Sequence, residues 1–584
     1  MKSKKWLISL GLAVVLVVAF ALPSCGEVTP DEYWHTPGDV KISFDVSASG
    51  AYQDVGLMVV QDLQDFGFDV DLAVLDSSTY YDYLYYPPGG GMVAFISAED
   101  PSPDPWSDWI WMMMGDPLGW GIDWNPFWYN NTAYDALMQQ NYFAQNLVAK
   151  EEILHELQQI LAEDIPMVFL VREQMIVGTR IDHWDNYYNE MGGVVSWINE
   201  WSIRNVTPVG NQTRFNIAVQ GLTPTLNMEQ DALQYTHFGC LYLMMVYENL
   251  IGYPQLNEES AYDFVPKLAT DYEVTYEADG AGGQNQVWTY TLREGVKWHD
   301  YDTEGENFTA DDVVFTLKYA MSPWGNQHPV NWTAVDEDTG GEEILPEHIL
   351  VTKTGDYEVQ FRYIEGYHQA EDYVPSRFLW YAMVPEHKFE GMSFDEICLD
   401  TGDYVGTGPY KVKEFVTDSY LLCERFDDYW GAGDEGDPYW ELPAAEEVLF
   451  QLFENEGSMW LAFEAGDIDC TAGPSVPHPK KDDYEDNPDI GIEVVPDLSI
   501  YYLGFNLHPT GGYEPLLDLA LREAIAAIVD KQNIVDISMG GYATTAESWV
   551  YPESVMYKSD LPNNTLDLTE AESILTAAGY TKHA

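Results

Sequence analysis

The sequence predicts an α/β fold, and three features of the chain favour this class. Residues 40–46 and 68–74 each alternate apolar with acidic, polar or small side chains, which is the period of a half-buried strand. Between them, apolar residues recur at helical spacing. A second amphipathic helix pattern, at 149–163, is followed by the apolar run 168–171. A strand, a helix and a strand in so short a stretch form a βαβ unit, whose two strands pair in parallel.

The composition limits what the protein can bind. The chain has 584 residues, of which 97 are acidic and 26 are Lys or Arg, so its formal net charge is −71. Binding to nucleic acid or to anionic lipid needs clustered Lys and Arg, so we expect neither. An apolar fraction of 46% argues against intrinsic disorder. We therefore expect a globular protein with a very acidic surface, from either a saline habitat or an ordinary extracytoplasmic compartment.

The first residues have the pattern of an export signal. Three lysines among the first five residues precede an apolar stretch at 6–22, which is short for a membrane span. Residues 22–25 read Leu-Pro-Ser-Cys and resemble a lipobox, in which the cysteine becomes the lipidated first residue. We therefore predict a signal peptide at 1–24, lipidation at Cys25 and a flexible tether over 25–38. Plain secretion with a chance cysteine is the alternative.

The residue types that carry metal or enzyme chemistry show no recognisable pattern. The remaining cysteines are widely spaced and form no Cys-x-x-Cys pair: Cys240, Cys398, Cys423 and Cys470. They are compatible with one or two disulfides or with buried free thiols. The 12 histidines lack ligand spacing, so we expect no metal site and no cofactor. Nucleophile elbow, zinc-protease and phosphate-loop motifs are missing, which predicts a protein that is not an enzyme.

The pattern of the sequence changes near residue 210. Residues 205–213, rich in Asn, Thr, Pro and Gly, predict a linker. After it, residues 287–293 alternate as a strand, and Thr309 with Asp312 has the spacing of a capping box at the start of a helix. Residues 333–346 resemble an acidic surface insertion. Apolar faces at helical spacing predict two last helices, at 517–528 and 568–578.

An ordered series of motifs runs through the second part of the chain. It includes Tyr-Glu-Asn-Leu at 247–250, Trp-Thr-Tyr-Thr-Leu-Arg-Glu-Gly-Val-Lys-Trp-His-Asp at 288–300, Gly-Thr-Gly-Pro-Tyr at 406–410 and Leu-Arg-Glu-Ala-Ile at 521–525. The series resembles family 5 extracellular solute-binding proteins, the oligopeptide- and dipeptide-binding components of ABC importers. This resemblance implies a two-lobed periplasmic-binding-protein-like fold, class II and of the large family 5 type, whose lobes close on a ligand by a hinge motion.

The order of the segments departs from that family. Its helix ending in Ala-Gly-Tyr is followed by a strand, a helix and a strand, whereas here the chain stops at Ala584 and the matching continuation is at 39–76. We therefore predict a circularly permuted fold, in which residues 39–204 form the C-terminal-type part, most of one lobe and the return crossing. A fragment of a tandem protein and a gene-assembly error are the alternatives.

The resemblance also implies a division into lobes. Residues 214–500 would form the N-terminal-type lobe with an inserted subdomain, joined to the preceding part by the linker. Residues 501–584 would begin the second lobe, which residues 39–180 complete. The strands that cross between the lobes are expected near 500–506 and 167–179.

In peptide-binding relatives, an Asp before an Asp-Pro turn anchors the peptide's α-ammonium group. The matching stretch here is 95–106, in which Asp100 takes the anchoring place, Glu99 is the fallback and Asp104 belongs to the turn. A solvated acidic turn without a ligand is the alternative.

Aromatic residues surround the predicted anchor. Phe95 stands near the place of the family's Trp, and Trp106 and Trp109 begin a Trp-rich stretch suited to peptide side chains or sugar faces. The sequence therefore predicts a monomeric, extracytoplasmic, membrane-anchored receptor that delivers a small-molecule ligand, most plausibly a peptide, to an ABC permease. Oligosaccharides and nickel or metal chelates are the rival ligands, and a sensory or cell-surface binding protein without a transporter is the rival function.

Overall fold

The computed structural model describes residues 33–35, 42–47, 51–76, 78–80, 84, 94–99, 125–142, 144, 146–196, 199–220, 244–252, 265–280, 282–320, 332–334, 349–363, 382–392, 404–433, 440–508, 514–562 and 564–583. The predicted signal peptide, Cys25, most of the acidic insertion and the predicted ligand segment from Asp100 onward lie outside the described residues.

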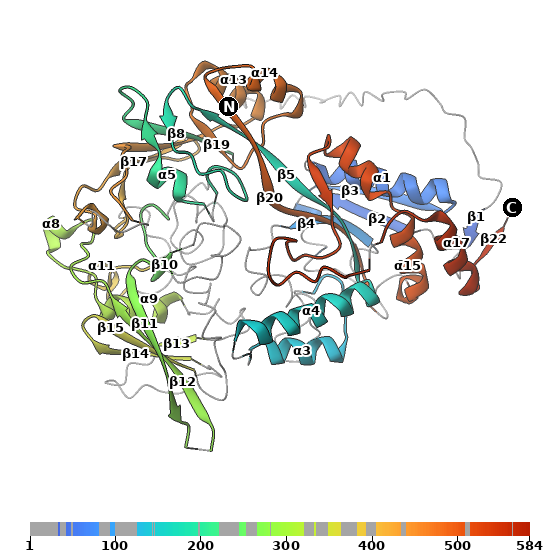
Figure 1. Ribbon diagram of the computed structural model, residues 1–584, viewed down its shortest axis with the longest axis horizontal. Helices are drawn as coiled ribbons and strands as arrows, with labels where there is room; N and C mark the ends of the chain where they lie inside the picture. Colours follow the sequence, from blue (N-terminus) through green and yellow to red (C-terminus); the bar gives the residue numbers. More distant parts are fainter. Residues whose placement is uncertain are drawn as a thin grey trace, which may run out of the picture.

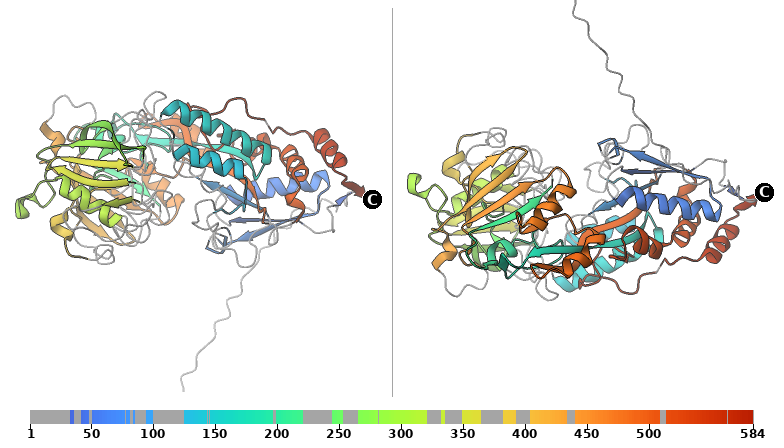
Figure 2. Two further views of the ribbon diagram at one scale, coloured as in Figure 1. Left: turned by 90° about the horizontal axis from the view of Figure 1, so that it is seen from below. Right: turned by 90° about the horizontal axis from the view of Figure 1, so that it is seen from above.

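Two lobes are joined by two long strands, β5 (Met167–Arg180) and β20 (Ile490–Phe505), which pair antiparallel and run from one lobe into the other (Figure 1). Both strands lie inside the largest sheet, whose order is β16-β17-β18-β8-β19-β5-β20-β4-β2-β3. We call the part around β2, β3 and β4 lobe A and the part around β8, β16, β17, β18 and β19 lobe B. Figure 2 shows the two lobes at opposite ends of the molecule.

Lobe A contains the predicted βαβ unit. Strand β2 (Ile42–Ser47), helix α1 (Ala51–Phe66) and strand β3 (Val70–Leu75) follow one another, and β2 pairs with β3 in parallel. Strand β4 (Ala94–Glu99) pairs in parallel with the other edge of β2 and antiparallel with β20. The unit and its parallel pairing are therefore confirmed.

Helices cover both faces of the lobe-A strands (Figure 1). On one face, α1, α15 (Leu519–Ile528) and α17 (Leu568–Ala577) contribute to a single apolar core. On the other face, α3 (Thr132–Tyr142) and α4 (Leu147–Asp164) pack over a second core. The amphipathic helix predicted at 149–163 is confirmed as α4; it begins after Asn146, whose side chain accepts a hydrogen bond from the Ala149 amide.

The described ends of the chain meet in lobe A. Strand β1 (Tyr33–His35) pairs antiparallel with β22 (Thr581–His583), directly after α17. Trp34 is buried in the core that also contains Leu575 and Tyr580. The N-terminal strands and the C-terminal helix thus bury their apolar side chains against each other.

Lobe B continues the large sheet with β8 (Arg214–Val219), β16 (Tyr410–Val416), β17 (Tyr420–Arg425), β18 (Glu447–Leu452) and β19 (Cys470–Ala472). Helices α13 (Glu456–Ala465) and α14 (Lys481–Glu485) lie next to it. Cys423 and Cys470 are buried free thiols. Cys240 and Cys398 lie outside the described residues.

A second, five-stranded sheet adjoins lobe B, in the order β11 (Ala269–Ala278), β12 (Gln284–Leu292), β15 (Glu358–Tyr363), β14 (Ile349–Gly355), β13 (Trp332–Ala334). Helix α9 (Ala310–Ala320) packs on it, and the pair has its own core. The strand predicted at 287–293 is confirmed as β12. The predicted cap is confirmed as well, since the Thr309 amide donates to the Asp312 carboxylate over 2.8 Å.

Short elements complete the fold. They are β6 (Trp184–Asp185), β7 (Thr207–Pro208), β9 (Ile251–Gly252), β10 (Val265–Pro266), β21 (Ala543–Thr545), α5 (Trp201–Asn205), α8 (Tyr301–Glu304), α11 (Glu386–Phe389), α16 (Lys531–Asn533), η4 (Trp430–Gly433), η5 (His478–Lys480), η6 (Glu514–Leu517) and the π-helical turn η7 (Ile534–Ser538).

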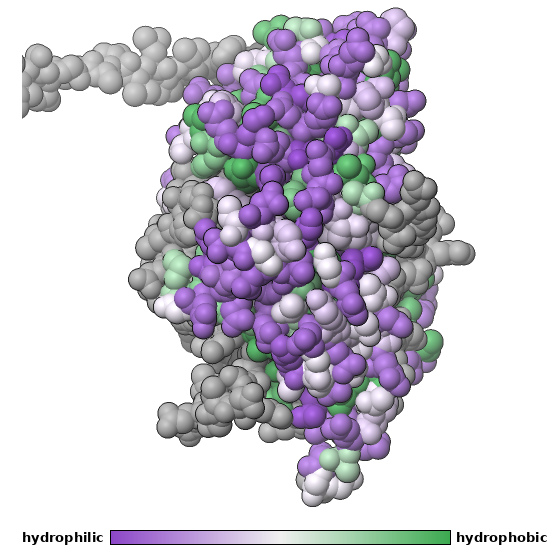
Figure 3. Space-filling view, turned by 90° about the vertical axis from the view of Figure 1, so that its left-hand side faces the viewer, coloured by the Kyte–Doolittle hydropathy of each residue, from purple (hydrophilic) through white to green (hydrophobic). Residues whose placement is uncertain are grey.

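The face that lobe B and the five-stranded sheet turn away from lobe A is predominantly hydrophilic, as the space-filling view in Figure 3 shows. Exposed residues also make up most of the segment predicted as a linker, where β7 pairs with β6. Within the described part of the chain, no helix combines the length and apolar character needed to cross a membrane.

Candidate ligand-binding region at the lobe crossing

The two long strands change lobes over a few residues. On β5, Val168 and Leu170 belong to a lobe-A core, whereas Met175 and Val177 belong to a lobe-B core. On β20, the regular pairing with β5 is interrupted between Pro496 and Ile500. The crossing therefore lies at residues 172–174 of β5 and 496–500 of β20.

This location agrees with one predicted crossing and refines the other. The range 167–179 contains the observed change of lobe, whereas 500–506 begins where β20 has already reached lobe A. Pro496 is the sequence signal of this irregularity, since a proline cannot donate to the ladder.

Three strands bring distant residues to one level of the sheet at the crossing. Ile500 of β20 pairs with Glu99 of β4 on one side and with Arg172 of β5 on the other. Neighbouring strands lie about 4.8 Å apart, so the Cα atoms of Glu99 and Arg172 are separated by about 10 Å. The last residue of β4, after which the predicted ligand segment begins, is therefore level with Arg172.

Arg172 is held by the segment that follows β21. Its Nη2 donates to the carbonyls of Ser548 and Val550, over 2.7 and 2.8 Å, and its guanidinium carbon lies 4.2 Å from the centroid of the Tyr551 ring. The side chain is buried, and burial lowers the pKa of Arg172 from its usual range. The guanidinium is thus fixed in orientation by groups that carry no full charge.

The adjoining residue, Glu173, belongs to a different set of contacts. Its carboxylate accepts a hydrogen bond from the Tyr501 hydroxyl over 3.3 Å, and the Tyr501 ring lies 5.6 Å from that of Tyr52 at the start of α1. Successive residues of a strand point to opposite faces, so Arg172 and Glu173 do not neutralise each other by direct contact.

A contact between the lobes lies beside this crossing. The Gln174 amide of β5 donates to the Tyr542 carbonyl over 2.9 Å, just before β21 pairs with β5. The Tyr542 ring meets the ring of His478 from lobe B, with centroids 4.8 Å apart. The segment from Tyr542 to Tyr551 therefore contacts the crossing along much of its length.

The predicted site residues are described only in part. Phe95 is 1% exposed and packs against Phe127 and Tyr502, with ring centroids 5.3 and 6.2 Å apart. A Cβ at Gly504 would lie 2.4 Å from the Phe95 ring, so this packing requires the glycine. Glu99 ends β4. Asp100, Asp104, Trp106 and Trp109 lie outside the described residues.

Sequence reasoning missed Arg172. The available signal was one basic residue after the apolar run 168–171, in a chain where acidic residues outnumber basic ones 97 to 26. Such a residue also fits a strand end that reaches solvent, so the pattern alone could not assign it.

Several of the family-like motifs converge on one buried carboxylate in lobe B. Glu248, from the Tyr-Glu-Asn-Leu motif, accepts hydrogen bonds from the Thr407 hydroxyl (3.1 Å), the Tyr429 hydroxyl (2.9 Å) and the Trp430 indole (2.7 Å). Glu248 itself is fully buried. These motifs therefore hold separate loops to one charge, which is a structural role.

Basic groups balance this carboxylate and a second one. Glu200 pairs with Arg204 over 2.6 Å and with Lys267 over 3.0 Å, and Arg204 also lies 3.6 Å from Glu248. Burial lowers the pKa of Lys267, while burial of Glu200 is outweighed by its two cationic neighbours, which lower its pKa. Two acids and two bases thus form a closed cluster, with Trp440 covering both cations.

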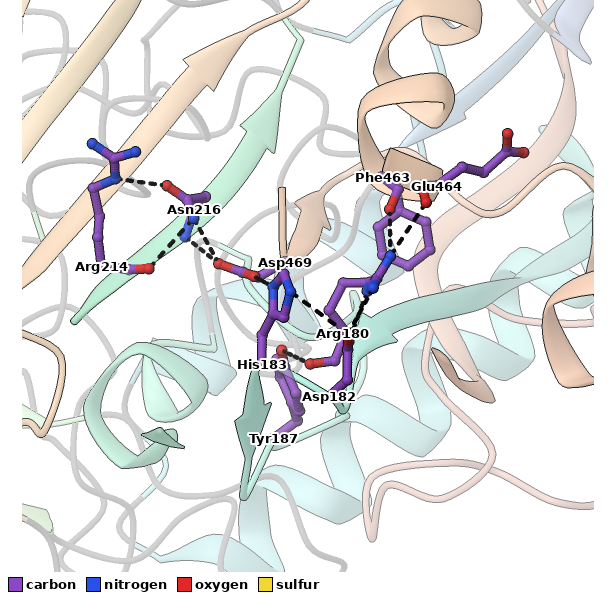
Figure 4. A network of polar contacts seen from close by, with 9 residues as sticks. All are labelled: Arg180, Asp182, His183, Tyr187, Arg214, Asn216, Phe463, Glu464 and Asp469. Carbon is purple, nitrogen blue, oxygen red and sulfur yellow. Dashed lines mark hydrogen bonds and ion pairs between the residues drawn. The ribbon is translucent and has the colours of Figure 1, made fainter. Parts of the chain in front are cut away.

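A second polar network fixes the lobe-B end of β5 (Figure 4). One oxygen of Asp469 contacts Nδ1 of His183 over 2.7 Å, and the other accepts from the amide and side chain of Asn216 over 2.7 and 3.0 Å. Burial raises the pKa of Asp469. Arg180 pairs with Asp182 and donates to the carbonyls of Phe463 and Glu464 at the end of α13.

This network ties β5, β8, β19 and α13 together. Its acids and bases satisfy one another, as the dashed contacts in Figure 4 show. Among the described residues no group of three or more His, Cys, Asp or Glu side chains is arranged to hold a metal ion. The network therefore stabilises the lobe.

The sequence matches a known family of proteins. Residues 263–584 match the family described as bacterial extracellular solute-binding proteins, family 5 Middle, and this is more than half of the chain. The protein belongs to that family. Its fold is accordingly the two-lobed α/β fold of periplasmic solute-binding proteins, as predicted, and the family consists of solute-binding receptors that act outside the cytoplasm.

The chain spans about half the length of the curated relatives that it matches. The dipeptide-binding protein of Escherichia coli K12 is 24% identical over 329 residues, 55% of this chain and 56% of the relative. The oligopeptide-binding protein AppA of Bacillus subtilis is 26% identical over 306 residues, 50% and 48% of the two chains. The nickel-binding periplasmic protein of Escherichia coli K12 is 24% identical over 341 residues, 58% and 56%.

Solved structures are similar over about two thirds of the chain. The substrate-binding protein CtaP of Listeria monocytogenes aligns with a TM-score of 0.45 and 20% identity, covering 64% of this chain and 66% of that one. AppA of Bacillus subtilis, in complex with a nonapeptide, aligns with a TM-score of 0.43 and 20% identity, covering 63% and 65%.

Proposed function

We propose that the protein captures a peptide between its two lobes and delivers it to an ABC importer. Membership of the solute-binding family over residues 263–584 is the observation that carries this proposal. The names of two relatives, a dipeptide-binding and an oligopeptide-binding protein, favour a peptide over other solutes. The narrow crossing at 172–174 and 496–500 supports a hinge motion, because among the described residues the two paired strands β5 and β20 change lobes there.

Identification of the bound solute tests the function. The purified protein is unfolded in acid and the released small molecules are weighed by mass spectrometry. We expect peptides. Saturation of the refolded protein with the identified peptide at about 100 times Kd should add about 2.7 kcal/mol to the free energy of unfolding. Sugars as the released solute, or peptides that leave the melting temperature unchanged, would exclude peptide capture.

A nickel or metal-chelate ligand is the second candidate. It is favoured by the nickel-binding relative, which matches as much of the chain as the peptide-binding ones do. A chelate can be held through its organic part, so direct metal ligation by the described residues is not required. Metal analysis of the same released fraction separates this candidate from a peptide.

We place the ligand's ammonium end at Asp100, with Glu99 as the fallback, Asp104 in the turn, and Phe95, Trp106 and Trp109 as the aromatic surroundings. The position of Glu99 at the end of β4 and at the level of the crossing supports this placement. Asp100→Asn keeps the shape and removes the charge, so it should weaken peptide binding about 30-fold or more. N-acetylation of the peptide should weaken binding to the unmutated protein equally, and equal binding of acetylated and free peptides would refute the role.

We further propose that the protein is a monomer anchored outside the cytoplasm through lipidated Cys25, with 1–24 as its signal peptide and 25–38 as its tether. The family's extracellular character and the Leu-Pro-Ser-Cys sequence support this proposal. Its partner would be an ABC permease, and a receptor without a transporter is excluded by showing peptide uptake that depends on the protein.

The permuted order also remains our proposal. It is supported by the pairing of β1 with β22 and by the single core that joins α1 with α15 and α17. In this arrangement residues 39–204 form the C-terminal-type part, 205–213 the linker, 214–500 the N-terminal-type lobe, and 501–584 the start of a lobe completed by 39–180.

A further inference from the structure

We propose that a contact between His478 of lobe B and residues 540–542 of lobe A is a latch that sets the angle between the lobes. This inference rests on the hinge motion of the proposed function and goes beyond it, because it names a device that controls that motion. Three observations carry it. Both sides of the contact are fixed to their own lobe, the contact leaves no room for a side chain at Gly540, and it lies beside the crossing.

The lobe-B side of the latch is firmly attached. His478 begins η5 and has a proline on either side, so the backbone around it has little freedom. Two residues earlier, the Val476 amide donates to the Ile176 carbonyl of β5 over 2.8 Å. Val476 and Ile176 both lie in the apolar core to which α13 and α14 contribute. The imidazole ring is therefore carried by the part of β5 that belongs to lobe B.

The lobe-A side is fixed as well. The segment follows the π-helical turn η7, whose Ile534 and Val535 lie in the lobe-A core together with Met539. The Gly541 amide donates to the Val535 carbonyl over 2.8 Å. The Tyr542 amide donates to the Met539 carbonyl over the same distance. Residues 540–542 should therefore move with lobe A when the angle between the lobes changes.

The two sides fit closely at the angle of this structure. The ring centroids of His478 and Tyr542 are 4.8 Å apart, and Tyr542 packs against the lobe-B core although lobe A carries it. The backbone at Gly540 lies so near the imidazole that a Cβ there would be 2.3 Å from Nδ1, closer than atoms can approach. A change in the angle has to slide these surfaces past each other or separate them.

The position of the latch gives it influence over the hinge. The Gln174 amide, at the crossing, donates to the Tyr542 carbonyl over 2.9 Å. Opposite Gln174, the regular pairing of β5 with β20 is interrupted between Pro496 and Ile500, so fewer ladder bonds oppose bending there. A contact between two aromatic rings changes an equilibrium constant about 2- to 12-fold. The latch should shift the balance between two lobe angles by that factor.

Single-molecule fluorescence energy transfer in the full-length protein measures the angle. Dyes are coupled to keto-bearing amino acids that replace Leu57 of α1 and Leu461 of α13, which are 50% and 65% exposed and lie in different lobes. The five cysteines then stay unmodified. Without solute, Tyr542→Ala and His478→Ala should each reduce the population of the main transfer efficiency, relative to the others, about 2- to 12-fold.

Gly540→Ala tests the latch with a wedge. Its Cβ must displace either the imidazole or the lobe that carries it, so this variant should lose the main transfer efficiency. Gly541→Ala is the matched control, because both glycines have a positive φ, 58° and 87°, whereas a Cβ at Gly541 meets nothing within 4 Å. The control carries a comparable backbone strain and should keep the distribution of the unmutated protein. Added to His478→Ala, Gly540→Ala should have no further effect.

Two results would overturn the latch. One is an unchanged distribution in Tyr542→Ala and His478→Ala, with circular dichroism showing that both variants are folded. The other is a shift in Gly541→Ala as large as the shift in Gly540→Ala, since strain alone would then explain the wedge. If Gly540→Ala does not fold, Tyr542→Ala and His478→Ala decide the question by themselves.

A second measurement separates the latch from the proposed function. A mixture of synthetic dipeptides and tripeptides is added to the unmutated protein and to Tyr542→Ala. If peptides shift the distribution, the apparent affinity of Tyr542→Ala should change by the factor by which its population of the peptide-bound efficiency changes, and an unchanged affinity would contradict the latch. If peptides cause no shift, capture of peptides by a hinge motion is refuted, while the solute-free comparison of Gly540→Ala with Gly541→Ala still decides the latch.

Discussion

The buried carboxylate Glu248 offers the sharpest test of what stabilises lobe B. Glu248→Gln keeps the size of the side chain and removes its charge. The carboxylate accepts three hydrogen bonds, from Thr407, Tyr429 and Trp430, and lies 3.6 Å from Arg204. The amide can accept at only one of its two ends, so at least one donor loses its partner.

The expected loss follows from these contacts. Removing one member of a buried charge pair costs about 3 to 5 kcal/mol, because the remaining charge stays buried, and each orphaned donor costs about 1 to 3 kcal/mol. These costs overlap, since they describe the same contacts. We therefore expect Glu248→Gln to lower the free energy of unfolding of lobe B by about 3 to 5 kcal/mol, which is a large part of the stability of a domain.

Urea titration at two salt concentrations measures this loss. Glu447→Gln is the control, because Glu447 pairs with Lys413 at the surface and should contribute less than about 1 kcal/mol. The control should change with salt, whereas the effect of Glu248→Gln should not, because buried charges are screened little. A loss below about 1 kcal/mol for Glu248→Gln would contradict the reasoning.

Three further predictions concern other parts of the molecule. Burial raises the pKa of Asp45 to about 6 from a usual 3.8; the folded state therefore binds more protons between these values, and stability falls as pH rises through them. Asp45→Asn should accordingly stabilise the protein by about 1 to 2 kcal/mol at pH 7.5 and have no effect below pH 4. Urea titrations at a series of pH values measure this difference. A stabilisation that stays the same at every pH would refute the prediction. Cys25→Ala should release the protein from the membrane fraction or leave it unprocessed, and unchanged membrane attachment would exclude lipidation at this residue. A rearranged chain, with residues 214–584 followed by 39–204, should fold with a circular dichroism spectrum and peptide affinity like those of the present order, whereas an unfolded product would argue against permutation.

The sequence predicted local elements well wherever a period was long and uninterrupted. Helix α4 and strand β12 lie within a few residues of their predicted ranges, because their apolar faces are continuous and their ends carry capping residues or turns. The family-like motifs indicated the fold, and three of their residues, Thr407, Tyr429 and Trp430, converge on Glu248 from separate loops.

The candidate site was harder to predict for physical reasons. Phe95 is predicted near the ligand, and its ring packs between Phe127 and Tyr502, which depends on the absence of a side chain at Gly504. No sequence pattern marks this packing. Arg172 was missed because its supporting carbonyls, at Ser548 and Val550, come from a segment more than 370 residues away in the sequence. Backbone carbonyls are supplied by every residue type, so no sequence pattern marks them.

The same features explain why motion between the lobes would concentrate at the crossing. On either side of it, β5 and β20 form continuous ladders that belong to separate apolar cores, and cores resist deformation. Between Pro496 and Ile500 the ladder is interrupted, and Pro496 has no amide hydrogen to contribute. Arg172 lies opposite this interruption and holds the segment after β21 by its carbonyls. A change in the angle between the lobes would therefore cost least at this part of the sheet.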